Sequence, residues 1–231
     1  KNEITDLYNQ AFIARGSGDF PQRLVVGQPI DVFYGYILDG VYQNQAEVNA
    51  DPTAVYANTN QGAGTVKPGY FKYKDLNGDG KIDDSDRTYL GAPVPTYYYG
   101  GSVAVNYKNW DLSVAFYGQG GNVILNRART EVIRTTGRNI DADFAINRWH
   151  GEGTTNEYVS SEGYRASWNN QKLSSFWLQK GDFFRVQNIQ LGYTLKANDI
   201  PEMRFTITAD RPFMWTRSKN LMNPEVNNDG V

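Results

Sequence analysis

The chain has 231 residues, of which 40% are hydrophobic and 14% aromatic, with a formal net charge of −2 and no cysteine. This aromatic content excludes an intrinsically disordered chain, and the absence of cysteine excludes disulfide scaffolds, cysteine-ligated zinc and thiol catalysis. Lys and Arg are scattered without a basic stripe, so nucleic acid is not expected as a partner. No run approaches the roughly 18 apolar residues of a membrane-spanning helix, which leaves a soluble β protein or a transmembrane barrel.

The first third of the chain predicts two strands and a long connection. One strand lies between Ile4 and Ile13, and another covers Val32 to Tyr42. A polar connection then runs from residue 43 to residue 95, interrupted by Tyr70 to Tyr73, whose side chains alternate as in a strand.

Residues 75–86 match the twelve-residue calcium loop of EF-hand proteins. Oxygen ligands are expected from six residues, namely Asp75, Asn77, Asp79, Lys81 through its carbonyl, Asp83 and Asp86. Gly80 stands where the sharp turn requires a positive φ, and Ile82 where such loops bury an apolar side chain. The sequence therefore predicts a site for calcium or another hard cation.

Two features separate this loop from the calcium sensors. Its twelfth residue is Asp86 instead of Glu, and the shorter side chain should weaken binding. Pro68-Gly69 and the strand-like residues that follow leave no place for a long entering helix. We therefore expect a structural clamp rather than a switch, with an Asp- and Gly-rich turn that holds no metal as the alternative.

The second half of the chain predicts two β-hairpins, because apolar and polar residues alternate on both sides of short breaks. The breaks lie at Lys108-Asn109 and between Lys196 and Glu202. The side chains expected on one face are Val103, Val105, Tyr107, Trp110, Leu112, Val114, Phe116, Ile189, Leu191, Tyr193, Leu195, Phe205, Ile207 and Ala209. Polar residues expected on the other face include Asp111, Asn188, Gln190 and Arg204.

The lengths of the connections predict the topology. The two short turns alternate with long polar connections over residues 43–95 and 118–181. In an up-and-down antiparallel sheet, alternate connections fall at the same end. Short turns at one end and long loops at the other are typical of outer-membrane barrels, whose long loops face the outside. Aromatic residues near strand ends, among them Tyr97, Trp110 and Trp215, would suit interfacial girdles.

No catalytic residue is predicted. His150 is the only histidine, so a histidine-based triad or a histidine-rich metal site has at most one member in this chain. Asp141 and Asp143 could be drawn as an acid and a base, but the sequence fixes neither their separation nor their pKa. We therefore expect a binding or transport protein rather than an enzyme.

An ordered set of segments resembles the SusC/RagA family of TonB-dependent outer-membrane transporters of the Bacteroidetes. The segments are Val26 to Pro29, Phe33 to Tyr36, Asp39 to Tyr42, Pro68 to Asp75, Leu90 to Pro95, Tyr99-Gly100, Arg148 to Thr154, Phe184 to Tyr193 and Asn223 to Val226. They extend over nearly the whole chain and occur in the family's order.

The resemblance implies an all-β fold of antiparallel up-and-down strands that is part of a transmembrane β-barrel of about 22 strands. Residues 1–231 would form the C-terminal part of that barrel, without the plug domain and the final strand, and residues 75–86 would lie in an extracellular loop. The family further implies a SusD-like surface lipoprotein, the TonB complex acting through the missing plug region, and import of oligosaccharides or peptides.

A secreted β-sandwich that binds carbohydrate, with calcium ordering one loop, remains the alternative from a different class. A sandwich would be soluble by itself, whereas barrel strands expose an apolar band to lipid.

Overall fold

The computed structural model describes residues 2–16, 21–54, 66–126, 140, 142–165, 173–197 and 200–218. The chain divides into two compact units. We call residues 93–124 and 180–230 the strand unit, and residues 2–92 and 125–179 the mixed unit. No helix in the described ranges is both long enough and apolar enough to cross a membrane.

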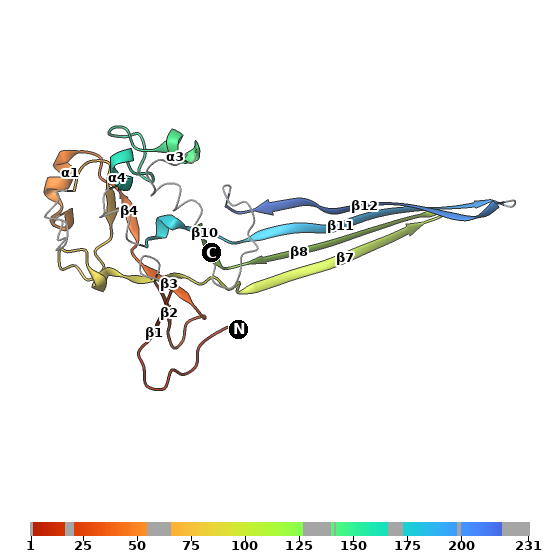
Figure 1. Ribbon diagram of the computed structural model, residues 1–231, viewed down its shortest axis with the longest axis horizontal. Helices are drawn as coiled ribbons and strands as arrows, with labels where there is room; N and C mark the ends of the chain where they lie inside the picture. Colours follow the sequence, from red (N-terminus) through yellow and green to blue (C-terminus); the bar gives the residue numbers. More distant parts are fainter. Residues whose placement is uncertain are drawn as a thin grey trace. The chain divides into compact units, whose positions relative to one another are not determined.

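The strand unit is built on one four-stranded antiparallel sheet (Figure 1). Its strands are β7 (Tyr97–Tyr107), β8 (Trp110–Gly120), β11 (Phe183–Ala197) and β12 (Ile200–Thr216). Their order in the sheet is β12-β11-β8-β7, so each strand lies beside its neighbour among the four in sequence. Both short turns lie at the same end of the sheet, as the connection lengths predict.

The turn between β7 and β8 has two residues, as predicted. Tyr107 pairs with Trp110, and Lys108 adopts a φ of 53° in the left-handed region that such tight turns require. The turn between β11 and β12 is shorter than expected, because β11 continues to Ala197 and β12 begins at Ile200. Paired residues of β11 and β12 therefore occupy most of the connection predicted between Lys196 and Glu202.

A bulge interrupts the regular alternation of β11, which the sequence pattern did not reveal. Val186 pairs with Phe116 and Asn188 with Ala115, so Gln187 has no opposite residue on β8. On the other side the register shifts at the same point, where Arg211 has a φ of 50°. An extra residue reverses the parity of a strand, so the even-numbered Phe184 lies on the same face as the odd-numbered Ile189.

The mixed unit combines short strands and helices. One sheet has the order β1-β2-β3-β6, while β4 pairs with β5 and β9 with β10. The strands are β1 (Ile13–Arg15), β2 (Gln22–Leu24), β3 (Val32–Gly35), β4 (Leu38–Val41), β5 (Phe71–Tyr73) and β6 (Thr88–Gly91), together with β9 (Val123–Leu125) and β10 (Leu178–Lys180), whose residues fall on both sides of the division between the units along the chain. The α-helices are α1 (Gln45–Ala50), α3 (Ala142–Asn147) and α4 (Ser161–Arg165), and short 3-10 helices span Pro52–Ala54, Asp84–Asp86 and Ser175–Trp177.

Two sequence predictions for this unit are wrong. The expected strand from Val32 to Tyr42 is broken at Tyr36, whose amide donates to the Leu173 carbonyl, so β3 and β4 join different sheets. The segment from Ile4 to Phe12 is not a strand, because Tyr8 and Asn9 have φ values of 50° and 66°. Local backbone turns end the pairing that the side-chain pattern suggested.

The mixed unit has an aromatic core of its own. Phe71 is fully buried, and its ring lies 4.9 Å from that of Phe176, which in turn lies 4.9 Å from Trp177. Phe33, Tyr42 and Phe144 are also buried almost completely. Each such side chain contributes about 1.5–3 kcal/mol relative to exposure, so this unit is stabilised by burial in the manner of a water-soluble domain.

Candidate functional site

The sheet of the strand unit has one strongly apolar face, and that face is exposed. All fourteen positions that the sequence pattern assigns to one face lie together across the paired registers. Ile207 is 74% exposed, Phe205 and Val103 are each 57% exposed, and every residue of β7 is classed as exposed. Exposed apolar surface of this extent is unfavourable in water, so the face requires an apolar environment.

Aromatic rings gather at both ends of this apolar face. At the turn end, the Trp110 ring lies 4.6 Å from that of Tyr193. At the opposite end, neighbouring ring centroids are 5.6 to 6.4 Å apart along a row that consists of Tyr97, Tyr99, Phe184, Trp215 and Phe213. Two aromatic rows on either side of an aliphatic band match the girdles at the two interfaces of a membrane.

The separation of the two rows agrees with the thickness of a bilayer. Tyr99 and Tyr107 lie on the same face of β7 and are eight residues apart. At about 3.4 Å per residue this distance is about 27 Å along the strand. A strand tilted by about 40° then covers about 21 Å of height, close to the apolar band of roughly 25 Å in outer-membrane barrels.

Glycines opposite the aromatic residues allow the rings to lie across the sheet. Tyr97 pairs with Gly120 and Tyr99 with Gly118. A Cβ atom at either glycine would collide with the ring of the opposite tyrosine. The flat rings cover the glycine backbone, as in other cross-strand pairs of aromatic residues with glycine. Gly118 and Gly120 therefore serve packing of the opposite rings.

The opposite face of the sheet is polar and carries paired side chains. The Arg204 guanidinium on β12 donates to Asp111 on β8 at 2.7 Å, spanning β11 at Gly192. A Cβ at Gly192 would meet the Asp111 carboxylate, so glycine leaves the space for this ion pair. Asn188 donates to Asp210 at 2.8 Å. The predicted polar face is confirmed, and it offers hydrogen-bonding groups.

The predicted calcium loop is ordered by its own amides. Asp75 accepts from the amides of Gly78 and Gly80 at 2.6 and 2.8 Å, and Gly80 has the expected positive φ of 78°. Asp86 is fully buried and accepts from the amides of Leu76 and Asp83. These bonds close the segment from both ends.

The remaining predicted ligands lie at the surface. Asn77 accepts from the Asp79 amide, Asp79 from the Lys81 amide and Asp83 from the Ser85 amide, each within one turn. Ile82 is only half-buried, which differs from the burial that the loop pattern predicts. As expected, no pair of long helices flanks the loop in the described residues: β5 precedes it, and its last three residues form the 3-10 helix Asp84–Asp86.

The oxygen donors of the loop suit a hard cation, but the structure does not bring the carboxylates of the loop together around one point. Oxygen atoms of Asp and Asn are the ligands that calcium takes. Among the residues that the structure describes, however, no three His, Cys, Asp or Glu side chains form a metal-binding group. The Gly80 amide, together with that of Gly78, lowers the pKa of Asp75. This carboxyl is therefore stabilised in its charged form by the backbone.

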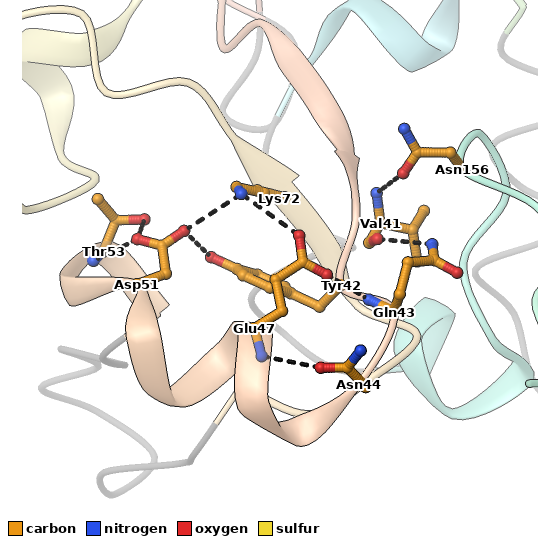
Figure 2. Close-up of polar contacts among 9 residues, drawn as sticks. All are labelled: Val41, Tyr42, Gln43, Asn44, Glu47, Asp51, Thr53, Lys72 and Asn156. Atoms are coloured by element: carbon orange, nitrogen blue, oxygen red, sulfur yellow. Dashed lines mark hydrogen bonds and ion pairs between the residues drawn. The ribbon is translucent and has the colours of Figure 1, made fainter. Parts of the chain in front are cut away.

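A polar cluster holds α1 against β5 (Figure 2). The buried Tyr42 hydroxyl donates to Asp51 at 3.0 Å, and Lys72 lies 3.4 Å from Glu47 and 3.8 Å from Asp51. Burial raises the pKa of Tyr42, which keeps its hydroxyl protonated as a donor. Burial opposes the ionisation of Asp51, but hydrogen bonds from Thr53 and Tyr42 and the charge of Lys72 outweigh it and lower the pKa.

Gln43 joins two of the segments that carry the family resemblance. Its side chain donates to the carbonyls of Val41 and Thr155, and it accepts from the Trp149 indole and the Gly153 amide. The Val41 amide in turn donates to Asn156 at 2.9 Å, as Figure 2 shows. Gln43 and Asn156 could not be recognised from the sequence, because polar residues in apparent loops give no periodic signal.

His150 and Asp143 make hydrogen bonds within the fold and do not form a catalytic arrangement with each other. His150 is exposed, and its Nδ1 lies 2.9 Å from the Arg148 carbonyl. Asp143 accepts from the Tyr158 hydroxyl at 2.7 Å and from Asn147 at 2.8 Å. Asp141 lies outside the described residues.

No protein-family model matches the chain. Among curated proteins, TonB-dependent receptor P26 of Formosa agariphila is 28% identical over the whole chain, which corresponds to 23% of that receptor. TonB-dependent receptor P3 of the same organism is 30% identical over 84% of the chain and 19% of that receptor. The chain therefore spans about a fifth to a quarter of the length of these relatives.

Solved structures share the fold. The RagAB peptide transporter matches 96% of the chain with a TM-score of 0.66 and 18% identity. The open-open state of the RagAB peptide importer matches the same share with a TM-score of 0.63. Together these matches support a fragment of a SusC/RagA-family TonB-dependent transporter. This confirms the resemblance, and the fold decides for a segment of a barrel over a secreted sandwich.

The matches also bear on two predictions made from the sequence, the cellular location and the absence of catalysis. TonB-dependent receptors and RagA-like transporters are outer-membrane proteins, which confirms the predicted location. The relatives are named receptors and transporters rather than enzymes, in agreement with the absence of a predicted catalytic residue.

The two faces of β7 give a matched test with neighbouring residues. Val103 lies midway between the two aromatic rows on the apolar face, and Ala104 lies on the polar face. We expect Val103→Arg to destabilise the intact transporter by about 2–4 kcal/mol, the cost of Arg at the lipid-facing midplane. Ala104→Arg should have a much smaller effect. Unfolding in urea from lipid vesicles measures both, and equal effects would contradict the assignment of the faces.

The lowered pKa of Asp51 makes the contact between α1 and β5 sensitive to acid. A carboxyl whose pKa is lower in the folded protein stabilises it above the unfolded value near 3.8, and this contribution disappears as the pH falls through the folded value. Hydrogen exchange of the α1 amides in the intact transporter should therefore accelerate on acidification below about pH 4, beyond the intrinsic change in exchange rate. In Asp51→Asn the α1 amides should be less protected at neutral pH and lose this acid response. An unchanged response would exclude Asp51 as its source.

Proposed function

We propose that this chain forms part of the barrel wall of an outer-membrane importer that is energised by TonB. The observation that carries the proposal is the two-faced sheet of the strand unit, with an exposed apolar face between two aromatic rows and a polar face behind it. Similarity to TonB-dependent receptors over the whole chain supports it.

The chain would supply strands of the C-terminal part of a barrel of about 22 strands. Within the described residues, β7 and β12 each pair on one side only, at the two edges of the sheet. Unpaired backbone groups are not tolerated in lipid. Further strands must therefore continue the sheet at both edges, and a plug domain elsewhere in the protein would contact the TonB complex.

The cargo would be oligosaccharides or peptides, taken up together with a SusD-like surface lipoprotein. The RagAB structures, which share the fold with this chain, are those of a peptide transporter. The polar face supports passage of polar solutes, because it carries hydrogen-bonding groups such as the Arg204–Asp111 pair and the Asn188–Asp210 pair.

We further propose that the loop of residues 75–86 binds calcium as a structural brace. Asp75, Asn77, Asp79, Asp83 and Asp86 would supply side-chain oxygens, and Lys81 its carbonyl. The oxygen chemistry of this set and the positive φ of Gly80 support the proposal. A bound cation would add positive charge next to carboxylates that accept hydrogen bonds from backbone amides.

Import is tested in cells that carry or lack the full-length transporter. Uptake of fluorescent neutral oligosaccharides and short peptides should be lost when the transporter is deleted, and also when TonB is inactivated. A SusD-like lipoprotein should be recovered with the transporter purified from the outer membrane. Uptake of both probe classes that does not change on deletion would refute the importer.

Calorimetry on the intact transporter tests the cation site. Calcium titration should release or absorb heat with a saturable profile in the wild type, and the signal should be lost in Asp75→Ala combined with Asp79→Ala. Asp111→Ala on the strand unit serves as the acidic control and should retain the signal. Identical titrations of the wild type and the double variant would show that the loop is a turn closed by its amides alone.

A further inference from the structure

A stack of planar side chains crosses the four-stranded sheet of the mixed unit. Arg23 on β2 lies between two rings, with its Cζ atom 4.0 Å from the centroid of Phe12 and 3.5 Å from that of Tyr34. The Tyr34 ring continues the row to Tyr89 on β6, with centroids 5.4 Å apart. The guanidinium is therefore covered on both of its faces.

The pairing of the strands places these side chains on one face of the sheet. Ala14 lies opposite Arg23, and Tyr34 lies opposite Tyr89. Val32 lies opposite Arg23 on β3 and shares a face with Tyr34, two residues on, while Phe12, the residue before β1, reaches the Arg23 guanidinium from the neighbouring segment. Phe12 and Tyr89 are 42% and 39% exposed, and the outer members of the row are therefore open to solvent.

The guanidinium of Arg23 has no carboxylate partner within the part of the chain that the structure describes. Its described interactions are the two contacts with Phe12 and Tyr34. Arg15 in the same hairpin differs, because its Nε lies 3.0 Å from Asp31. The Asp31 carboxylate is thus paired with Arg15 and not with Arg23.

This environment prepares Arg23 for an oxyanion. Rings above and below a guanidinium hold its plane and remove water from both faces, while the N–H edge stays available. A fixed guanidinium edge matches the two oxygens of a carboxylate in a bidentate geometry. The flanking rings offer apolar surface to the remainder of the same ligand.

We propose that Phe12, Arg23 and Tyr34 form a recognition site for a carboxylate group of the imported cargo. The inference rests on the proposed import function, since the ligand is taken to be cargo. Two cargo classes carry this chemistry, namely glycans with uronic acid residues and peptides with a free C-terminus. The site distinguishes acidic cargo from neutral cargo of the same size.

Binding to the full-length transporter in detergent tests the site with two matched pairs of probes. The first pair is trigalacturonate and its methyl ester, and the second is a pentapeptide and its C-terminal amide. We expect tighter binding of the acidic member in at least one pair. Arg23→Gln should remove roughly 10- to 100-fold of that affinity, the worth of a charge-assisted hydrogen bond. Arg23→Lys should restore only part of it.

Arg15→Gln is the control, because it removes an equal charge from the same hairpin and should leave the preference unchanged. Thermal unfolding of each variant shows whether the fold is kept. A preference in one pair identifies the source of the carboxylate. Equal affinity of the wild type and Arg23→Gln for both acidic probes overturns the site and leaves the stack as a structural pin. TonB-dependent uptake of neutral probes would persist in that case, which separates this failure from failure of the importer proposal.

Discussion

The exposed apolar face of the four-stranded sheet is the constraint on which the rest of the molecule depends. Each 100 Å² of apolar surface left in water costs about 2.5 kcal/mol, and the face presents aliphatic and aromatic side chains along the length of four strands. Among its described residues, the strand unit gathers only a few buried side chains, around residues 122–124 and at Phe183 and Arg185, so burial within the unit does not relieve this cost. A bilayer does, and the two aromatic rows mark where its interfaces lie.

The same environment explains the polar side of the sheet and its glycines. Charges on a barrel wall are stable when they are paired, as Arg204 and Asp111 are across β11. Gly192 provides the space for that pair, while Gly118 and Gly120 receive the rings of the opposite tyrosines. Small residues in this sheet therefore serve packing on both faces.

The mixed unit follows different rules, because it buries its own core. Gln43 connects the chain after β4 to the segment around Trp149, and the cluster of Tyr42, Asp51 and Lys72 fixes α1. Segments that resemble the family motifs are thus joined by structural hydrogen bonds. The acidic loop belongs to the same pattern, since backbone amides order its carboxylates before any cation is considered.

The sequence by itself determined the faces of the long strands, the tight turn at Lys108 and the positive φ of Gly80 in the acidic loop. These depend on local periodicity and on glycine positions, which a single chain displays directly. It did not determine the bulge at Gln187, the break at Tyr36, or the contacts of Gln43 and Arg23. Those depend on which distant segments meet, and hydrogen bonds or ring contacts between residues far apart in sequence leave no periodic signal. Tertiary structure alone decided them, because the energy of such contacts exists only once both partners are in place.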